Sequence, residues 1–381
     1  MTRFALPVAG LVAALVAVLA VSPAATRPET SSVAAVRSCA APVRSAAMCL
    51  SQRLSAAGAS TPRGLGARDI RSAYALSMTA GGGRTVAVVV AYDDPTAASD
   101  LAVYRKTYGL PPCTTANGCF RKVNQAGRST MPRVDAGWAG ESSLDIEMVS
   151  AACAACRILL VEASTASMAD LAAAVDYAAT QRVSAISNSY GSTDSTHAAA
   201  YDHPGIAVVA AAGDSSYGSG WPASYSSVIA VGGTTLVRAA NARGWSETAW
   251  KGTGSACAMG SRKPTWQSSA TRCAGKAVTD VSAVADPATG VAAYVATPYG
   301  GVKGWQVFGG TSAAAPLIAG VYAMSGRTAG YPASYTWGHR TGLNDITRGT
   351  NGSCSTRLWC NAATGWDGPT GLGTPRGTAS F

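Results

Sequence analysis

The sequence predicts an α/β fold with a mainly parallel central sheet, because patterns typical of buried strands alternate along the chain with patterns typical of helices. Residues 85–91 (TVAVVVA) form a continuous apolar run, as in a strand buried on both faces, and a polar turn with Pro95 follows. The chain has 381 residues, of which 48% are hydrophobic, enough for a large buried core. In such folds ligands bind beyond the carboxyl ends of the strands, so the chemistry is expected in the loops found there.

The other elements follow from the same patterns. Further strands are expected at 157–161, 185–189, 206–212 and 228–231, and helices at 97–108, 142–152 and 168–180. Regular structure is expected to begin near Arg68. Residues 238–304 show little periodicity and are interpreted as loop-rich excursions of the same domain.

The amino-terminal residues have the order of a secretory signal. Arg3 precedes an apolar run at 4–21, and small residues follow at 22–25. We therefore predict a signal peptide at 1–25, a short N-terminal segment at 26–66 and one large domain at 67–381. The protein is expected to be secreted, with no stable membrane association after signal cleavage. An uncleaved membrane anchor is the alternative.

Ten cysteines in an exported chain favour disulfides, and they fall along the sequence as near neighbours. The predicted pairs are Cys39–Cys49, Cys113–Cys119, Cys153–Cys156, Cys257–Cys273 and Cys354–Cys360. A redox or metal pair is the alternative for Cys153 and Cys156, but the sequence has no second CxxC. The net charge of +10 is spread without a basic run, which argues against nucleic acid as a partner.

Ser312 lies in a pattern that suits a nucleophile. Residues 309–316 read GGTSAAAP and lead into an apolar stretch at 317–324, so Ser312 is expected near the start of a buried helix. Small neighbours let a substrate backbone approach, and a helix amino terminus favours the negative charge that develops on an attacked carbonyl. A role as helix N-cap is the alternative, since serine is preferred there for its own sake.

Two carboxylates supply a candidate base for this serine. Glu141 and Asp145 are four residues apart, which places both on one face of a helix. Like charges at that spacing cost roughly 0.2–0.5 kcal/mol on an exposed helix, whereas a semi-buried pair shares a proton. For Glu141, an acidic first turn favoured by the helix dipole is the alternative.

Together, E-x-x-x-D and G-T-S-A-x-x-P resemble the motifs of the sedolisins, serine-carboxyl peptidases with a subtilisin-like three-layer fold. The resemblance extends from about Ala67 to the carboxyl terminus. It implies that Ser312 is the nucleophile, Glu141 its general base, and Asp145 the group that orients Glu141. The expected substrates are proteins or peptides, and the expected state is a monomer.

A third motif, AAGDS at 211–215, resembles the oxyanion-hole segment of the same family. It implies that Asp214 donates a hydrogen bond to the oxyanion, which an aspartate can do only while protonated. A simple Gly-Asp turn at a strand end is the alternative. The resemblance therefore predicts a bell-shaped pH profile with an optimum between roughly pH 3 and 5.5.

The carboxyl-terminal loops resemble the sedolisin calcium site. The resemblance implies one structural Ca²⁺, held by the side chains of Asp345 and Asp367 and by the carbonyl oxygens of Ile346, Ala363 and Gly365. Members of the family usually have glycine at the position of Ala363, which puts the conformation of that loop in question.

Two other functions stay open at this point. The first is a histidine-dependent, subtilisin-like hydrolase using Asp93 or Asp94 with His203 and Ser312; the second is a non-catalytic secreted binding protein on a peptidase scaffold. Sedolisin precursors usually carry a long folded propeptide, whereas only residues 26–66 separate the predicted signal from the domain here. Activation by propeptide removal is therefore an open question.

Overall fold

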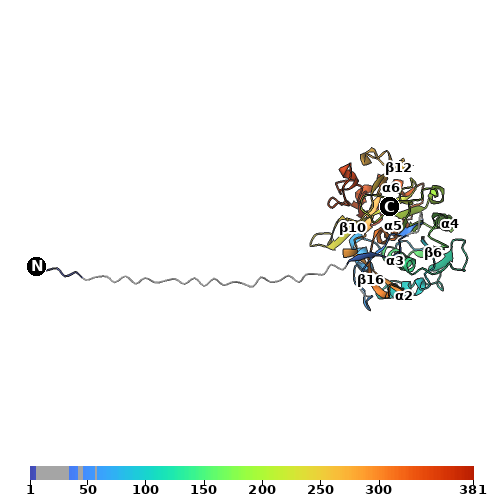
Figure 1. The fold of residues 1–381 in the computed structure, drawn as a ribbon, viewed down its shortest axis with the longest axis horizontal. Helices are drawn as coiled ribbons and strands as arrows, with labels where there is room; N and C mark the ends of the chain where they lie inside the picture. Colours follow the sequence, from blue (N-terminus) through green and yellow to red (C-terminus); the bar gives the residue numbers. More distant parts are fainter. Residues whose placement is uncertain (6–33, 42–45, 56–57) are drawn as a thin grey trace. The chain divides into compact units, whose positions relative to one another are not determined.

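The computed structural model describes residues 1–5, 34–41, 46–55 and 58–381. Most of the predicted signal peptide at 1–25, and part of the segment at 26–66, lie outside these described residues. The chain divides into two units, residues 1–32 and residues 33–381, and the architecture below is that of the second (Figure 1). Within the described residues, no helix has the length and apolar character needed to cross a bilayer.

The centre of this unit is a sheet of eight strands, which are β4 (Thr85–Ala91), β5 (Phe120–Asn124), β6 (Arg157–Ala163), β7 (Ala185–Asn188), β9 (Ala207–Ala211), β10 (Ile229–Arg238), β11 (Trp245–Ala249) and β14 (Val281–Val284). Their order is β11-β10-β9-β7-β4-β6-β5, with β14 paired to β10. Only the β10–β11 pairing is antiparallel. Residues 86–91 of β4 are all buried, so both faces of the sheet are covered. The predicted α/β class with a mainly parallel sheet is confirmed.

Helices flank this sheet, and the described α-helices are α1 (Ala67–Tyr74), α2 (Ala97–Thr107), α3 (Ala136–Ala152), α4 (Met168–Ala179), α5 (Thr311–Ser325) and α6 (Pro332–Gly338). Single 3₁₀ turns are η1 (Ala198–Tyr201), η2 (Ser269–Thr271), η3 (Pro287–Thr289), η4 (Arg340–Gly342) and η5 (Arg357–Trp359). Helices α3 and α5 pack on each other, and α4 packs on β4 and β6.

Helix α3 begins earlier than the sequence pattern indicated. Asp135 is its N-cap, and its carboxylate accepts hydrogen bonds from the backbone N–H groups of Gly137 at 3.1 Å and Trp138 at 3.2 Å. The helix therefore starts at Ala136 instead of residue 142. As a result, Glu141 lies beyond the first turn, and the alternative of an acidic first turn does not apply to it.

Two predictions about irregular regions are wrong. Regular structure begins well before Arg68, with β1 (Ala35–Arg37), β2 (Met48–Cys49) and β3 (Gln52–Leu54), and the supposed loops at 238–304 contain several strands. The further strands are β8 (Tyr190–Gly191), β12 (Ala256–Arg262), β13 (Gly275–Val278), β15 (Val291–Tyr299), β16 (Val302–Gly309), β17 (Leu343–Asn344) and β18 (Thr374–Pro375). The early strands pair with distant partners, β3 with β16 and β2 with β8, so local periodicity does not reveal them.

All five predicted disulfides are confirmed. The bridges join Cys39–Cys49, Cys113–Cys119, Cys153–Cys156, Cys257–Cys273 and Cys354–Cys360, and no described cysteine is free. The pair in Cys153-Ala-Ala-Cys156 is therefore a bridge, as expected in an oxidising compartment.

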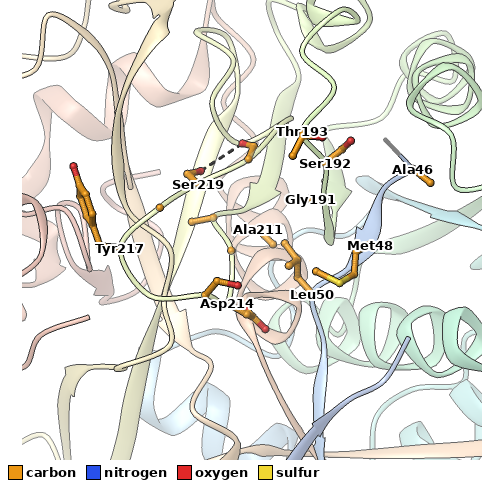
Figure 2. Close-up of a pocket in the computed structure, with 15 residues that line it drawn as sticks. Ala46, Met48, Leu50, Gly191, Ser192, Thr193, Ala211, Asp214, Tyr217 and Ser219 are labelled. Carbon is orange, nitrogen blue, oxygen red and sulfur yellow. Dashed lines mark hydrogen bonds between the residues drawn. The ribbon is translucent and has the colours of Figure 1, made fainter. Parts of the chain in front are cut away.

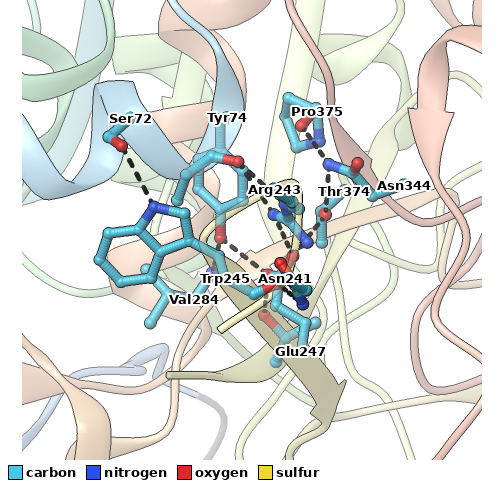
Figure 3. Close-up of polar contacts among 12 residues, drawn as sticks. Ser72, Tyr74, Asn241, Arg243, Trp245, Glu247, Val284, Asn344, Thr374 and Pro375 are labelled. Carbon is cyan, nitrogen blue, oxygen red and sulfur yellow. Dashed lines mark hydrogen bonds and ion pairs between the residues drawn. The ribbon is translucent and has the colours of Figure 1, made fainter. Parts of the chain in front are cut away.

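A buried carboxylate fastens the carboxyl-terminal segment to the sheet (Figure 3). Glu247 Oε1 accepts from the hydroxyls of Tyr74 at 3.0 Å and Thr234 at 2.7 Å, and its Oε2 accepts from Arg243 at 2.6 Å and Thr374 at 2.7 Å. Each donor comes from a different part of the chain. With four donors the carboxylate is well compensated for its burial.

Candidate active site

Glu141 lies on α3 with its side chain fully buried. Its Oε2 accepts a hydrogen bond from the backbone N–H of Ser51 at 3.1 Å, whereas Oε1 has no hydrogen-bond partner among the described residues. Burial raises the pKa of Glu141 to about 8; the hydroxyls of Ser312 and Ser51 oppose this shift, and the charge of Asp214 adds to it. A buried carboxyl with a free oxygen is suited to exchanging a proton with a neighbouring hydroxyl.

Asp145 lies one helical turn further along α3 and is also fully buried. Both its carboxylate oxygens, and the Ser189 hydroxyl nearby, lack hydrogen-bond partners within the described part of the chain. Burial, followed by the charge of Glu141, raises the pKa of Asp145 well above its usual range, and the Ser189 hydroxyl acts in the opposite direction. Two buried carboxyls one helical turn apart oppose each other's ionisation.

Ser312 is the second residue of α5, as the sequence predicted, and is fully buried. The N-cap of this helix is Gly310, so the alternative role of Ser312 as N-cap does not apply. Its Oγ donates to the carbonyl oxygen of Ser189 at 3.2 Å. In this rotamer the hydroxyl is not directed at Glu141, although it is near enough to lower the pKa of that carboxyl.

Asp214 follows β9 at its carboxyl end, close to the start of α5. Its Oδ1 accepts from both the N–H and the hydroxyl of Thr311 at 2.8 Å, and its Oδ2 accepts from Gln52 Nε2 at 3.2 Å. Burial raises the pKa of Asp214 to about 6, with the hydrogen bonds from Thr311 opposing the shift. A carboxyl with this pKa holds a proton at acid pH and can then donate a hydrogen bond.

Gly310 lies where the Leu50 carbonyl and the Asp214 carboxyl approach the start of α5. Its φ is +89°, and a Cβ there would lie 2.1 Å from the carbonyl oxygen of Leu50 and 2.6 Å from Asp214 Oδ2. Only glycine fits this position. The Leu50 carbonyl and the Asp214 carboxyl therefore flank the same point, immediately before the helix that carries Ser312.

The Leu50 carbonyl belongs to an extended segment of this chain that lies in the site. In β2, Met48 and Cys49 pair antiparallel with Gly191 and Tyr190. The next residue, Leu50, donates its N–H to the Ser189 carbonyl oxygen at 3.1 Å and accepts at its own carbonyl from the Ser312 N–H at 3.3 Å. The segment is thus held by strand addition, the way a cleft binds an extended peptide.

The two residues after Leu50 contact the acidic side chains. Ser51 donates its N–H to Glu141, and Gln52 donates its side-chain amide to Asp214. Three consecutive residues of one segment therefore contact Ser312, Glu141 and Asp214.

A cavity of about 370 Å³ adjoins this segment (Figure 2). Figure 2 shows Leu50 and Met48 at its edge, beside Ala211 and Asp214. The remaining lining comes from Ala46 and from residues 191–193, 212, 213, 215 and 217–220. Several of these residues are small and uncharged, which suits an apolar side chain of a bound peptide.

The three histidines have other partners. His203 pairs with the carbonyl of Ala200 at 3.0 Å and lies 3.7 Å from Asp176. His197 lies 3.6 Å from Asp194, and His339 stacks on Tyr335. Among the contacts of the described residues, none joins a histidine to Ser312.

Asp93 and Asp94, the aspartates of the histidine-dependent alternative, also bind other residues. Asp93 forms an ion pair with Lys122 at 2.5 Å, and Asp94 accepts from Ser143 and Thr96. Neither contacts His203 in the described part of the chain. The arrangement therefore offers carboxyls, and not a histidine, beside the serine.

The loops proposed for calcium also come together. Asp345 Oδ2 accepts from the Gly365 N–H and Asp367 Oδ2 from the Ala363 N–H, both at 2.9 Å. Burial raises the pKa of Asp367 to about 7, and the charge of Asp345 adds to the shift. No described basic side chain forms an ion pair with either carboxylate.

The donors at this place fit a hard cation. The carbonyl oxygens of Ile346, Ala363 and Gly365 receive no hydrogen bond from the described residues, so they remain available alongside the two carboxylates. Ala363 does not have a positive φ, whereas Gly365 does, at +85°. Alanine is therefore compatible with the backbone at 363, which answers the question that its departure from the family pattern raised.

Several residues of the site were not foreseen from the sequence. Leu50, Ser51 and Gln52 lie in a stretch without periodicity, and no pattern marks them. Ser189 ends a predicted strand, and the rule that ligands lie at strand ends could have singled it out. Thr311 adjoins Ser312 in the nucleophile motif but has no signature of its own.

Comparison with known proteins agrees with this geometry. The subtilase family matches residues 136–337, more than half of the chain. Sedolisin of Pseudomonas sp. (strain 101) is 34% identical over 179 residues, 42% of this chain and 29% of that protein. Kumamolisin of Bacillus sp. (strain MN-32) is 34% identical over 201 residues, 45% of this chain and 35% of that protein. The chain thus spans about a third of the length of these curated relatives.

Solved structures give the same assignment. The structure of Pseudomonas sedolisin (serine-carboxyl proteinase) complexed with two molecules of pseudo-iodotyrostatin superposes with a TM-score of 0.69 at 25% identity, covering 83% of this chain and 96% of that one. Fervidolysin from Fervidobacterium pennivorans, a keratinolytic enzyme related to subtilisin, has a TM-score of 0.51 at 15% identity, covering 81% of this chain and 44% of that one. The second likeness concerns the fold alone.

Proposed function

This chain belongs to the subtilase family and within it is of the sedolisin type, and on that premise we propose that it is a secreted serine-carboxyl endopeptidase acting at acid pH. Its substrates are proteins or peptides. The observation that carries the proposal is the set of contacts made by residues 50–52, which reach Ser312, Glu141 and Asp214 in succession. A peptide held in this way exposes one carbonyl to the serine.

The proposed chemistry is acyl transfer. Ser312 Oγ attacks the substrate carbonyl while Glu141 takes the hydroxyl proton and later delivers it to the leaving amine. Asp145 is the positioning residue that keeps Glu141 in place and shares its proton. The Ser312 N–H and a protonated Asp214 stabilise the oxyanion.

Two further parts of the proposal rest on separate observations. Five disulfides favour an oxidising compartment, which supports secretion. The paired carboxylates Asp345 and Asp367, with unpaired carbonyls beside them, favour one structural Ca²⁺. We expect the enzyme to act as a monomer.

The test is cleavage of an unfolded protein substrate as a function of pH, compared between the wild type and His203→Ala. The serine-carboxyl mechanism predicts cleavage at acid pH that is unchanged in the histidine variant. Loss of cleavage in His203→Ala, with an optimum above pH 7, would restore the histidine-dependent hydrolase. Absence of cleavage at every pH would favour the binding protein.

A further inference from the structure

The segment that lies in the site is held as a substrate would be, and the contacts single out one of its peptide bonds. In the bond between Leu50 and Ser51, the carbonyl oxygen accepts from the Ser312 N–H at 3.3 Å, and the amide nitrogen donates to Glu141 Oε2 at 3.1 Å. The two ends of this bond thus face the two groups that peptide hydrolysis requires. Among the described residues, no other peptide bond contacts both Ser312 and Glu141.

The residues on either side of this bond also make contacts that place the Leu50–Ser51 bond at Ser312. Before the bond, β2 pairs with β8, and the Leu50 N–H and the Ser312 hydroxyl share the Ser189 carbonyl as acceptor. After the bond, the Gln52 side chain donates to Asp214. Leu50 is 6% exposed and lines the cavity beside β9.

We propose that the Leu50–Ser51 peptide bond is this enzyme's own first substrate, cleaved within the molecule by Ser312, and that the cavity receiving Leu50 selects apolar residues before the bond that is cut. This inference rests on the proposed function. It adds which bond is cut, how the segment is positioned at Ser312, and which class of side chain precedes the cut. None of these follows from the sequence motifs.

The step balances without any co-reactant except water. Ser312 Oγ forms a bond to the Leu50 carbonyl carbon, and its proton passes to Glu141. The carbon–nitrogen bond to Ser51 then breaks as Glu141 returns that proton to the departing amine. Water attacks the resulting ester, again through Glu141, and releases a Leu50 carboxylate and free Ser312.

The disulfides permit the fragment to leave. Cys39–Cys49 lies entirely before the cut, and the other four bridges lie entirely after it. The part before the cut is then held only by non-covalent contacts, chiefly β1 against β3 and β2 against β8. Its departure opens the cavity and the site to other peptides, while β3 stays paired with β16.

The experiment uses the full chain purified at about pH 8 and shifted to about pH 4.5, where Asp214 is protonated. Intact mass and amino-terminal sequencing under denaturing conditions follow the cut, and cleavage of an added leucine-containing peptide is followed in parallel. We expect a new amino terminus at Ser51, formed at a rate unchanged by about tenfold dilution. Peptide cleavage should rise as the new terminus appears.

Three variants make the outcome specific. Ser312→Ala should keep an intact amino terminus for at least about 100 times longer. Leu50→Asp should slow the cut by at least about tenfold, because a charge would enter an apolar cavity. Val36→Asp, on the exposed face of β1, is the matched control and should be cut at the wild-type rate.

Since Leu50→Asp also alters a buried position, Ser51→Pro provides a second variant, because proline removes the N–H that Glu141 accepts. It should remain uncut. Cleavage of the added peptide while residues 50 and 51 stay joined would overturn self-cleavage and leave the proposed function intact. A cut whose rate scales with enzyme concentration would also overturn it, because the reaction would then be between molecules. If Ser312→Ala is cut as fast as the wild type, or if the full wild-type chain cleaves neither itself nor the added peptide at any pH, the proposed function itself fails.

Discussion

The hydroxyl of Ser312 donates to the carbonyl oxygen of Ser189 at 3.2 Å, although Glu141 lies beside it with one oxygen unpartnered. The nucleophile is therefore turned away from its proposed base while residues 48–52 fill the site. Ser312 is near enough to lower the pKa of that carboxyl, and a change of acceptor from the carbonyl to the carboxyl is the step that would activate the serine.

The first prediction concerns the nucleophile and its base. Ser312→Ala and Glu141→Gln should each lower kcat by at least about 100-fold, because proton transfer and nucleophilic attack are both lost. Steady-state cleavage of a peptide by chains expressed from residue 51 onward measures this, since neither variant is expected to remove the preceding residues itself. The matched control is Glu147→Gln on the same helix, a buried carboxyl whose raised pKa keeps it neutral at acid pH, so an amide should replace it with little loss. Equal losses in control and test variants would contradict the assignment.

The second prediction concerns the pH profile. Burial raises the pKa of Asp214 to about 6, so the proton it must donate is held below that pH and lost above it. Activity should therefore fall as the pH rises through about 6, with an optimum between roughly pH 3 and 5.5. Asp214→Asn should move the alkaline limb of kcat/KM upward, because an amide donates at any pH. An unmoved limb would mean that another group sets it.

The raised pKa of Glu141 concerns the same profile. Its largest cause is burial, and the segment at 48–52 supplies part of that burial. The first cut at acid pH therefore uses the small fraction of Glu141 that is ionised while the segment is in place. Once residues up to 50 have left, water reaches the carboxyl and its pKa should fall, so a larger fraction of Glu141 can accept a proton at acid pH. A pH titration should accordingly find Glu141 ionising at a lower pH in processed enzyme than in the uncut Ser312→Ala chain.

The third prediction is that the fold is more stable in acid than in base. Burial raises the pKa of Asp94 to about 6 and of Glu162 to about 9, the latter opposed by Lys122, and it raises those of Asp145 and Glu147 as well. Between about pH 4 and 8 the folded chain thus holds protons that the unfolded chain has released, and the free energy of unfolding falls as pH rises. The Tm of Ser312→Ala, which cannot digest itself, should be higher at pH 5 than at pH 8. The reverse order would show that these carboxyls are ionised in the folded state.

The fourth prediction concerns the metal. Chelation, Asp345→Ala or Asp367→Ala should each lower the Tm of Ser312→Ala in the presence of calcium, because a ligand that binds only the folded state stabilises it. Asp176→Ala, an exposed carboxylate remote from these loops in sequence, is the control and should leave the calcium dependence unchanged. A Tm that does not respond to calcium in any of these chains would remove the metal site.

Much of this site was predictable because its spacing is local. The i, i+4 relation of Glu141 and Asp145 follows from helix geometry alone, and Ser312 adjoins an apolar run that marks its helix. By contrast, the segment at 46–54 has short strands rich in small and polar residues, and β8 and β16, which hold it in the site, lie more than 100 residues away. Such pairing is determined by tertiary contacts, so no periodicity in the segment could reveal it.

Glu247 links the carboxyl-terminal end of the chain to the central sheet, so the two are expected to unfold together. Its carboxylate joins the hydroxyl of Tyr74 in α1 to that of Thr374 in β18, and Tyr74 accepts in turn from the N–H of Val284 in β14. Opening the carboxyl-terminal segment would take the Thr374 donor away from this buried carboxylate, so local fraying there is costly. The amide hydrogens of β14 and of the last residues should therefore exchange with solvent at similar rates. The loops around Asp345 and Asp367 lie in the same carboxyl-terminal part of the chain, so their local opening should be costly as well.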